Sequence, residues 1–324
     1  MVLRKVVISC LLLFLLVDGL SSTAAACTIF SASNNETTLV GNNEDWEHNN
    51  FSIIFYPENF LGYGHVAFVA TEDYLDVRAG MNTQGVFIDS ASVRPSNVTI
   101  DPEKLFINHN FFKRVLWTCS SVNETIEMFQ HFNIAETWNW QVFVADSYGD
   151  SVVIAAGPDE TVWYVRGNGT YQLCTNGNIA YPELGQSDWS ALRYDQAESM
   201  LEEFGDNITV VNARDVLDAV HSVWTGFSSV YDLVNRDIYI YFNHDYSKEI
   251  VFNLDEELAL GGHSFEIVEL YQSITIPSTT TTVSITSNMK TTTLDSNLLL
   301  TLSMSFSIVI SAIVIVLFFM KQRK

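Results

Sequence analysis

The chain has 324 residues, of which 48% are hydrophobic and 13% aromatic, enough to bury a large core. Its formal net charge of −22 at pH 7 argues against nucleic-acid partners, because binding to phosphates needs basic patches. The seven histidines show neither HExxH nor Cys/His ligand spacing, so the sequence predicts no metal site and no cofactor.

The first 26 residues have the pattern of a cleavable signal peptide. A short basic start precedes an apolar run from Val6 to Val17, and small residues follow up to Ala26. That apolar run is roughly half the ~20 residues that a membrane-spanning helix needs. We therefore expect removal of residues 1–26 and a mature protein that begins at Cys27.

The next part of the chain alternates between strand-like and helix-like segments. Periodicity predicts strands at 28–33, 38–41, 52–56, 66–70 and 85–89, and helices at 102–117 and from Ser121 onward. Strands return at 140–145, 151–155, 161–166 and 171–175, with a hairpin predicted at 167–169. Helices at 189–204 and 213–224 precede strands at 237–242, 249–254 and 264–270. This order predicts a layered α+β fold with largely antiparallel sheets in one domain, residues 27–273.

The C-terminal part has a different composition. Residues 274–297 are rich in threonine and serine, which predicts an extended stalk. Residues 298–320 are almost entirely apolar and long enough to cross a hydrocarbon core of about 30 Å. The basic residues 321–324 follow, and basic tails stay on the cytoplasmic side. The pattern predicts a type I membrane protein with its domain outside the cell or in a lumen.

Sequons and cysteines are consistent with the secretory route. Six asparagines are candidates for glycosylation: Asn35, Asn50, Asn97, Asn123, Asn168 and Asn207. The mature chain keeps three cysteines, and an odd count suggests one free thiol. We expect Cys27 to be free, with Cys119 and Cys174 either bridged or buried.

Cleavage after residue 26 would give Cys27 both a thiol and a free α-amine. The amine has a reference pKa of about 7.7–8.0, so it is a far better base at neutral pH than a lone carboxylate. One residue could then supply the nucleophile and the base that activates it. The alternative, lipidation of Cys27, is disfavoured because Ala24 stands where a lipoprotein signal has a leucine-like residue.

A turn at 34–37 predicts which residue lies across from Cys27. A hairpin centred near Glu36 pairs residues whose numbers sum to about 72, which places Asp45 opposite Cys27. A carboxylate at that position could hold the ammonium form and orient the amine.

Several strings of residues, in order along the chain, resemble the choloylglycine hydrolase and penicillin V acylase superfamily of linear-amide hydrolases. They are Cys27-Thr-Ile-Phe, Val40-Gly-Asn-Asn-Glu-Asp45-Trp46, Gly80-Met-Asn82-Thr-Gln-Gly85-Val, Thr175-Asn176, Arg193-Tyr194 and the segment from Phe252 to Ser264. The resemblance covers nearly all of 27–270. It implies a four-layer αββα sandwich of the N-terminal nucleophile (Ntn) hydrolase type.

The resemblance also assigns roles to matching positions. It implies that the Cys27 thiol attacks the amide carbonyl, that Asp45 positions the amine and that Asn176 donates to the oxyanion. Arg193 matches the active-site arginine of the superfamily and would steady Asp45 or the thiolate.

Three further positions are candidates for contact with substrate or oxyanion. Asn42 stands where many members carry arginine, and Ser92 where an asparagine often serves the oxyanion hole. Asn82 belongs to the matching Gly80–Gly85 string. These departures bear on substrate class more than on mechanism.

The resulting functional prediction is a membrane-anchored extracellular cysteine amidase that acts on a small N-acyl compound. Segments 51–64, 86–94 and 139–141 are expected to form an aromatic pocket suited to an apolar acyl group. An acyltransferase of the same fold and a non-catalytic stalked receptor remain the alternatives. Oligomeric state is left open by the sequence.

Overall fold

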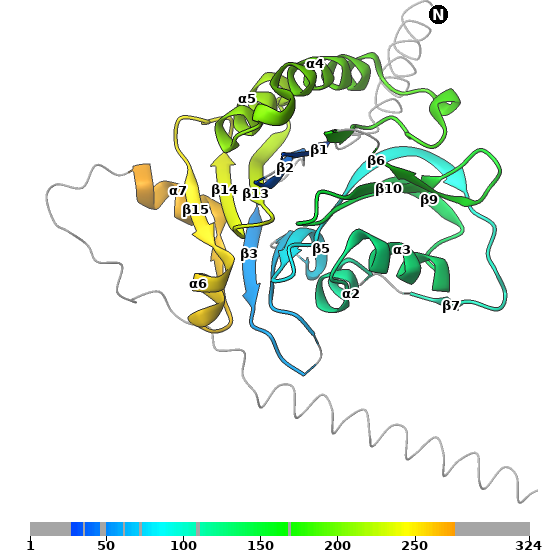
Figure 1. Cartoon of the computed structure of the whole chain (residues 1–324), viewed down its shortest axis with the longest axis horizontal. Helices are drawn as coiled ribbons and strands as arrows, with labels where there is room; N and C mark the ends of the chain where they lie inside the picture. The colour runs from blue at the N-terminus through cyan, green and yellow to red at the C-terminus, as the bar shows by residue number, and fades with distance from the viewer. Residues whose placement is uncertain are drawn as a thin grey trace, which may run out of the picture. The chain divides into compact units, whose positions relative to one another are not determined.

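The computed structural model describes residues 27–34, 36–45, 50–60, 62–70, 73–107, 111–167 and 170–275 (Figure 1). The predicted signal peptide, nearly all of the predicted stalk and the predicted membrane helix at 298–320 lie outside these ranges. Among the described residues, no helix is both long and apolar enough to cross a membrane. The last described helix continues to Thr275, so the predicted domain boundary after residue 273 falls inside it.

The first sheet, which we call sheet A, has six antiparallel strands in the order β12-β1-β2-β13-β14-β15. Their bounds are β1 Thr28–Ser33, β2 Thr38–Asp45, β12 Tyr171–Cys174, β13 Thr225–Asp232, β14 Asp237–Phe242 and β15 Ile250–Asn253. Strand β1 therefore lies between β2, its neighbour in sequence, and β12, which comes from the middle of the domain.

The second sheet, sheet B, has eight antiparallel strands in the order β11-β10-β9-β6-β5-β4-β3-β16. Their bounds are β3 Phe51–Tyr56, β4 His65–Ala70, β5 Asp73–Asn82, β6 Phe87–Asn97, β9 Thr137–Ala145, β10 Ser151–Ala156, β11 Val162–Arg166 and β16 His263–Glu266. A small parallel pair, β7 Leu105–Phe106 and β8 Phe132–Asn133, lies apart from both sheets.

Helices cover the outer face of each sheet, which gives four layers. Sheet A is covered by α4 and α5, and sheet B by α2 and α3 (Figure 1). The helices and 3₁₀ turns are α2 Phe111–Thr118, α3 Val122–His131, η2 Pro182–Leu184, α4 Asp188–Phe204, η3 Gly205–Asn207, α5 Val210–Val220, α6 Leu254–Ala259 and α7 Ile267–Thr275. The predicted α+β fold with four αββα layers is thus what the described residues form.

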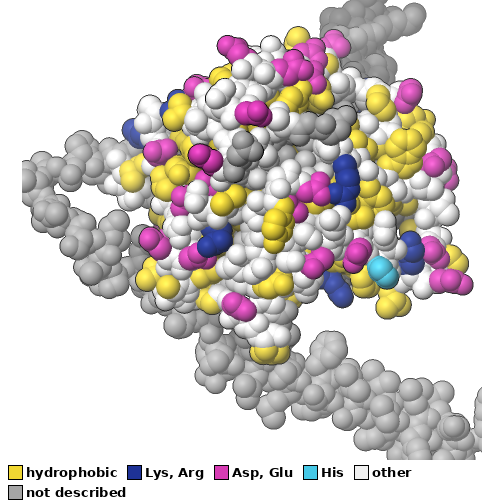
Figure 2. Space-filling view, in the orientation of Figure 1, with side chains coloured by type: hydrophobic (Ala, Val, Ile, Leu, Met, Phe, Trp, Pro, Cys, Tyr) yellow, Lys and Arg dark blue, Asp and Glu magenta, His cyan; other side chains and the backbone are white. Residues whose placement is uncertain are grey.

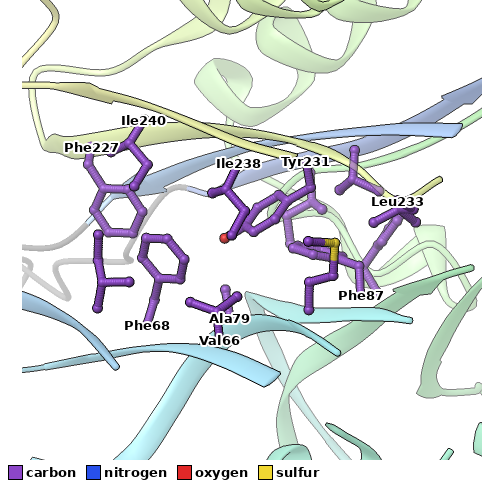
Figure 3. Close-up of a cluster of buried hydrophobic side chains, with 14 of the residues drawn as sticks. Val66, Phe68, Ala79, Phe87, Phe227, Tyr231, Leu233, Ile238 and Ile240 are labelled. Atoms are coloured by element: carbon purple, nitrogen blue, oxygen red, sulfur yellow. The ribbon is translucent and has the colours of Figure 1, made fainter. Parts of the chain in front are cut away.

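Three hydrophobic clusters hold the layers together. One fills the space between the two sheets, where Phe68 and Phe227 stack with ring centroids 5.3 Å apart and Tyr231 lies near Phe87 (Figure 3). The other two lie between each sheet and its helices. Burial of apolar side chains on both faces explains why strands such as β2 and β10 are buried along their whole length.

Alternation along β1 decides which layer each of its residues joins. Ile29 lies in the cluster between the sheets, whereas Phe30 and Ala32 lie in the cluster under α4 and α5. Successive side chains of a strand point to opposite faces. The same rule separates Cys27, which belongs to the cluster between the sheets, from Thr28.

The predicted hairpin at 167–169 is wrong. Strand β11 is the edge of sheet B, whereas β12 pairs with β1 in sheet A. The chain therefore crosses from one sheet to the other at this point. Glycine and asparagine allow a sharp change of direction, but they do not determine which strand the chain joins next.

Other elements differ from the predicted ones in type or extent. Strands β5 and β13 were not predicted, and the helix expected at 102–117 is reduced to α2, after the short β7. The segment predicted as a strand at 264–270 divides into β16 and the amphipathic α7. In α7, Ile267, Leu270 and Tyr271 pack on the core with the spacing of one helical face.

The surface agrees with the acidic composition. Acidic side chains are spread over the face drawn in Figure 2, with only scattered lysines and arginines among them. Four of the six candidate glycosylation sites belong to the described residues, and all four are exposed: Asn50, Asn97, Asn123 and Asn207. Asn35 and Asn168 lie outside the described ranges.

Candidate active site

The side chain of Arg193 is the centre of the candidate site. It projects from α4 and is only 2% exposed. Its Nη1 donates to the carbonyl oxygen of Cys27 at 3.1 Å and to the hydroxyl of Thr28 at 2.6 Å. Its Nη2 donates to Oδ1 of Asn176 at 2.6 Å, and Nη1 lies 4.0 Å from Oδ2 of Asp45. The buried guanidinium of Arg193 thus lies next to the other three residues that the resemblance singled out, Cys27, Asp45 and Asn176.

Asp45 lies at the end of β2 in a buried position. The Thr225 hydroxyl donates to its Oδ1, and its Oδ2 has no hydrogen-bond partner among the described residues. Burial raises the pKa of the Asp45 carboxyl to about 6, although Thr225 and Arg193 oppose the shift. A buried carboxylate oxygen without a donor is able to accept a hydrogen bond from a nearby ammonium group.

The predicted register of the first hairpin is off by one residue. Thr28 pairs with Asn43, so the numbers of paired residues sum to 71 rather than 72. By the same register, Glu44 and not Asp45 lies across from Cys27. A shift of one residue places a side chain on the other face of the sheet. Asp45 accordingly lies with Arg193 on the α4 face, and the Cys27 thiol lies on the face between the sheets.

The Cys27 thiol is buried in an acidic environment. Burial raises its pKa, and the carboxylates of Glu44, Asp45 and Asp89 raise it further. A hydrogen bond to the Asp45 backbone acts in the opposite direction. In the full-length chain, Cys27 is still joined to residue 26 by a peptide bond. Removal of the leader would place a positive charge beside the thiol and favour the thiolate.

The Asn176 amide is oriented by two elements of the fold. Its backbone N–H donates to Oγ of Ser190 on α4 at 3.0 Å, and its Nδ2 donates to the carbonyl oxygen of Ser92 at 2.9 Å. Because Arg193 donates to Oδ1, the amide has a defined direction, with its N–H groups turned away from the guanidinium. Ser92 thus contributes a carbonyl that holds Asn176 in place.

Two of the further candidates, Asn82 and Asn42, have different surroundings. The Asn82 amide donates to the carbonyl oxygens of Leu116 and Cys119, and its Oδ1 accepts from two backbone N–H groups of the next turn. All its hydrogen-bonding capacity is therefore used to hold the turn against α2, which is a structural role. Asn42 is fully buried, and neither of its amide atoms has a hydrogen-bond partner among the described residues.

The other two cysteines are free and buried in different layers. Cys174 belongs to the cluster between the sheets and Cys119 to the cluster under α2 and α3. Of the two alternatives that the sequence left open, burial without a disulfide is the one found. Burial raises the pKa of both thiols, so they are poor nucleophiles at neutral pH.

Sequence reasoning missed three residues of this region: Glu44, Asp89 and Thr225. Glu44 is buried beside the candidate Asp45, and the alternation of β2 was a signal that the two face opposite sides. Thr225 begins the unpredicted strand β13. Asp89 lies in sheet B, where no local pattern distinguished it from a turn residue.

Comparison with known proteins was made on sequence and on structure. Residues 32–245 match the family model of acyl-coenzyme A:6-aminopenicillanic acid acyl-transferase. No functionally curated protein sequence matches the chain.

Two solved structures have a similar fold. A variant of conjugated bile acid hydrolase from Clostridium perfringens superposes with a TM-score of 0.60 at 18% identity, covering 74% of this chain and 96% of that one. Penicillin V acylase from Agrobacterium tumefaciens superposes with a TM-score of 0.54 at 14% identity, covering 74% and 90%. The resemblance predicted from the sequence is confirmed by these matches, and all three descriptions are of enzymes.

Proposed function

Because this chain belongs to the acyl-coenzyme A:6-aminopenicillanic acid acyl-transferase family, within the choloylglycine hydrolase and penicillin V acylase superfamily, we propose that it is a cysteine amidase. Its substrate is a linear amide of an N-acyl compound, and its nucleophile is the Cys27 thiol. The α-amine of the processed Cys27 is the base.

The observation that carries this proposal is the contact set of Arg193. A buried guanidinium touches the Cys27 carbonyl oxygen and the Asn176 amide and lies 4.0 Å from the Asp45 carboxylate. Burying an arginine is costly unless its charge is balanced and its N–H groups are hydrogen-bonded. A receptor domain would have no need to collect these groups around the first residue of its mature chain.

Each group has a part in the first half of the reaction. The thiol proton of Cys27 passes to its own α-amine while Sγ forms a bond to the carbonyl carbon, and the carbonyl electron pair moves onto oxygen. The unpartnered Oδ2 of Asp45 accepts from the resulting ammonium. The Asn176 amide donates to the oxyanion, where loss of one donor typically costs 10²–10³ in rate.

The second half returns the enzyme to its starting state. The oxyanion pair reforms the carbonyl, the C–N bond breaks, and the ammonium proton passes to the departing nitrogen. This leaves a thioester on Cys27 and a free amine product. Water then adds to the thioester with the α-amine as base, which releases the carboxylic acid and restores the thiol.

The proposal includes a cellular location. The apolar run of residues 6–17 and the small residues before Cys27 support export with removal of the leader. The apolar segment 298–320 and its basic tail support a single membrane anchor at the C-terminus, with the catalytic domain outside the cell or in a lumen. The acidic surface and the exposed sequons are consistent with that setting.

Acyl transfer is the second candidate function. The specific observation in its favour is the family match, whose description names an acyl-transferase. The two reactions share the thioester and differ only in whether water or an amine takes the acyl group. Addition of a competing primary amine to an active preparation separates them, because a transferase would convert the acyl group into a new amide.

The experiment that tests the proposal has two parts. The N-terminus of the secreted protein is determined by intact mass and terminal sequencing, and turnover is measured on a panel of chromogenic N-acyl amides. We expect a free Cys27 amine, turnover in the wild type and none in Cys27→Ala. A blocked or differently placed N-terminus would remove the base, and equal turnover in Cys27→Ala would assign the activity to another group.

A further inference from the structure

The candidate oxyanion donor, Asn176, lies in a segment without regular structure. Strand β12 ends at Cys174, and the next residues, 175–181, form neither a helix nor a strand. Inside this segment the N–H of Tyr181 donates to the carbonyl oxygen of Asn178, which closes a turn after the donor and not around it. The direction of the Asn176 amide therefore depends on side chains that hold the segment from outside.

The side chain of Gln141 holds this segment at three points. Its Nε2 donates to the carbonyl oxygen of Thr175 at 2.8 Å and to that of Gly177 at 2.8 Å. Its Oε1 accepts from the backbone N–H of Ile179 at 3.1 Å. One amide is thus bonded to the backbone on both sides of Asn176, so it restricts the peptide groups that carry the donor.

Gln141 reaches this segment from the other sheet. It lies on β9 opposite Ala91 of β6, and both Ala91 and Phe143 belong to the cluster between the sheets. Side chains two residues apart on a strand share a face, so Gln141 extends from sheet B towards sheet A. Its side chain is 0% exposed. A buried amide is costly unless it is hydrogen-bonded, and here its Nε2 has two carbonyl partners.

A second contact to the same backbone comes from α4. Oγ of Ser190 accepts from the backbone N–H of Asn176 at 3.0 Å and donates to Oε1 of Gln186 at 2.9 Å. A Cβ added at Gly177 would collide with that same Oε1, so the chain is tightly packed next to the donor. The backbone at Asn176 is thus held by Gln141 from sheet B and by Ser190 from the helix.

The contacts of the Asn176 amide depend on where this backbone lies. Its Oδ1 accepts from Arg193, and its Nδ2 donates to the carbonyl oxygen of Ser92. We propose that Gln141 is a positioning residue for the reaction, because it holds residues 175–179 so that the Asn176 amide is directed at the oxyanion. This inference rests on the amidase function proposed above and adds a residue of sheet B to it.

A positioning role and a purely structural role have different consequences. A glutamine that only stabilises the fold changes the free energy of unfolding and leaves kcat per folded active site unchanged. A positioning residue changes kcat, because displacement of a catalytic group by about 1 Å can cost about 10²-fold in rate. It changes KM little, since the charge on the oxyanion develops only after the substrate has bound.

The test measures kcat and KM for a chromogenic N-acyl anilide on the processed protein, with active sites counted by titration of the Cys27 thiol. Gln141→Met keeps the length of the side chain and removes its hydrogen bonds. Gln141→Glu keeps the acceptor for Ile179 and loses the amide donors. We expect kcat to fall about tenfold to 10²-fold in both variants, with KM changed by less than about threefold.

A double-mutant cycle identifies the group through which Gln141 acts. In Asn176→Ala there is no amide left to misplace, so adding Gln141→Met should lower kcat by less than about twofold further. Gln172→Ala is the matched control. Gln172 is a buried glutamine of β12 whose Nε2 donates to the carbonyl oxygen of Val165 at 2.7 Å. Its replacement should reduce stability and leave kcat unchanged.

The outcomes distinguish this inference from the proposed function. Unchanged kcat in folded Gln141→Met and Gln141→Glu overturns the positioning role and leaves the amidase function intact. Additive losses in the cycle overturn the action through Asn176. Failure of both Gln141 variants to fold, with Gln172→Ala folded, assigns Gln141 a structural role instead. No turnover by a wild-type protein with a free Cys27 amine counts against the amidase function itself.

Discussion

At strands β1 and β2, the two faces of sheet A differ in the charged groups that are buried there. On the α4 face, Asp45 is balanced by Arg193, and the same guanidinium is hydrogen-bonded to Thr28 and Asn176. On the face between the sheets, Glu44 and Asp89 surround the Cys27 thiol with negative charge. Consecutive residues of β2 therefore lie in different surroundings, Asp45 beside a guanidinium and Glu44 on the side of the thiol.

This difference shows that two consecutive residues of one strand can have quite different surroundings. Because side chains alternate along a strand, Glu44 and Asp45 point to opposite faces of sheet A. On the α4 face, Arg193 lies beside Asp45 and the helix sets the geometry, and Oδ2 of Asp45 has no hydrogen-bond partner among the described residues. The other face has unmatched polar atoms at Asn42 and Asp89. We expect changes on the first face to affect both folding and catalysis.

The largest effect is expected from Arg193→Met. Removing one partner from a buried ion pair typically costs 3–5 kcal/mol, because Asp45 is left buried without its countercharge. For a domain of this size that corresponds to a fall in Tm of roughly 10 °C. Activity should fall to the level of Cys27→Ala. Scanning calorimetry and anilide turnover measure the two effects, and Arg193→Lys should recover part of the stability but little activity because it cannot reproduce the fork of N–H donors.

A second variant isolates Asn176, the proposed oxyanion donor, whose Oδ1 accepts from Arg193. Asn176→Ala should reduce kcat by about 10²–10³, with a small change in KM, because the donor acts on charge that develops in the transition state. Asn178→Ala is a matched control two residues away. The Asn178 amide holds a turn through Ala156, Ala180 and Tyr181. It should reduce stability and spare kcat, and similar kinetics for both variants would contradict the role given to Asn176.

The pH dependence of turnover tests the role of Asp45. The carboxylate can hold an ammonium group only when ionised, so activity is expected above its pKa and lost as pH falls through it. Burial raises that pKa to about 6 in the unprocessed chain, and the nearby ammonium of processed Cys27 lowers it again. The Asp45 contribution to the acidic limb of kcat/KM should therefore have its midpoint at or below about pH 6, and it makes the limb steeper than protonation of the Cys27 α-amine alone would.

Asp45→Asn gives the matched measurement. The variant has no titrating group at this position, so its residual activity should lose the Asp45 part of the acidic limb and keep only the part that protonation of the Cys27 α-amine produces. Persistence of the same limb in Asp45→Asn would assign it to another group. In that case the contact between Asp45 and Arg193 would have only a structural role.

The smallest effect is expected from the second thiol between the sheets. Cys174 shares the layer of Cys27 but is free and 1% exposed. Cys174→Ala should lower the free energy of unfolding by about 1–2 kcal/mol through lost packing, with kcat unchanged. Reducing agent should not shift the Tm of the wild type, since neither Cys119 nor Cys174 is bridged. A reductant-sensitive Tm would reveal a disulfide and contradict this arrangement.

Much of the fold could be predicted from local pattern and resemblance. Strand β1 matches the predicted span, β2 is longer by four residues and α4 starts one residue earlier. The buried faces of such elements have regular spacing, which a sequence displays directly. Strand β13 was missed because Ser228 and Ser229 interrupt its apolar run. Those hydroxyls are buried by the tertiary structure, where Ser228 donates to Asn43 at 2.6 Å.

The site was predicted in its members and only partly in its geometry. Cys27, Asp45, Asn176 and Arg193 were named from the resemblance, and the structure joins all four. Their arrangement differs from the prediction because the pairing of β1 with β2 is shifted by one residue. The turn at 34–37 allowed either register, and the burial of two faces selected one of them.

By itself, the sequence determined the chemistry that is available: a cysteine after a predicted export signal, a family of matching motifs and an acidic domain rich in apolar residues. These properties depend on residues close together in the chain. Only the tertiary structure decided which carboxyl lies beside Arg193 and which lies on the thiol's face, because that depends on strand register and on the packing of β6 against β1 across the sandwich. Glu44 and Asp89 are 45 positions apart, and no local pattern can bring them together; the packing of two buried sheet faces does.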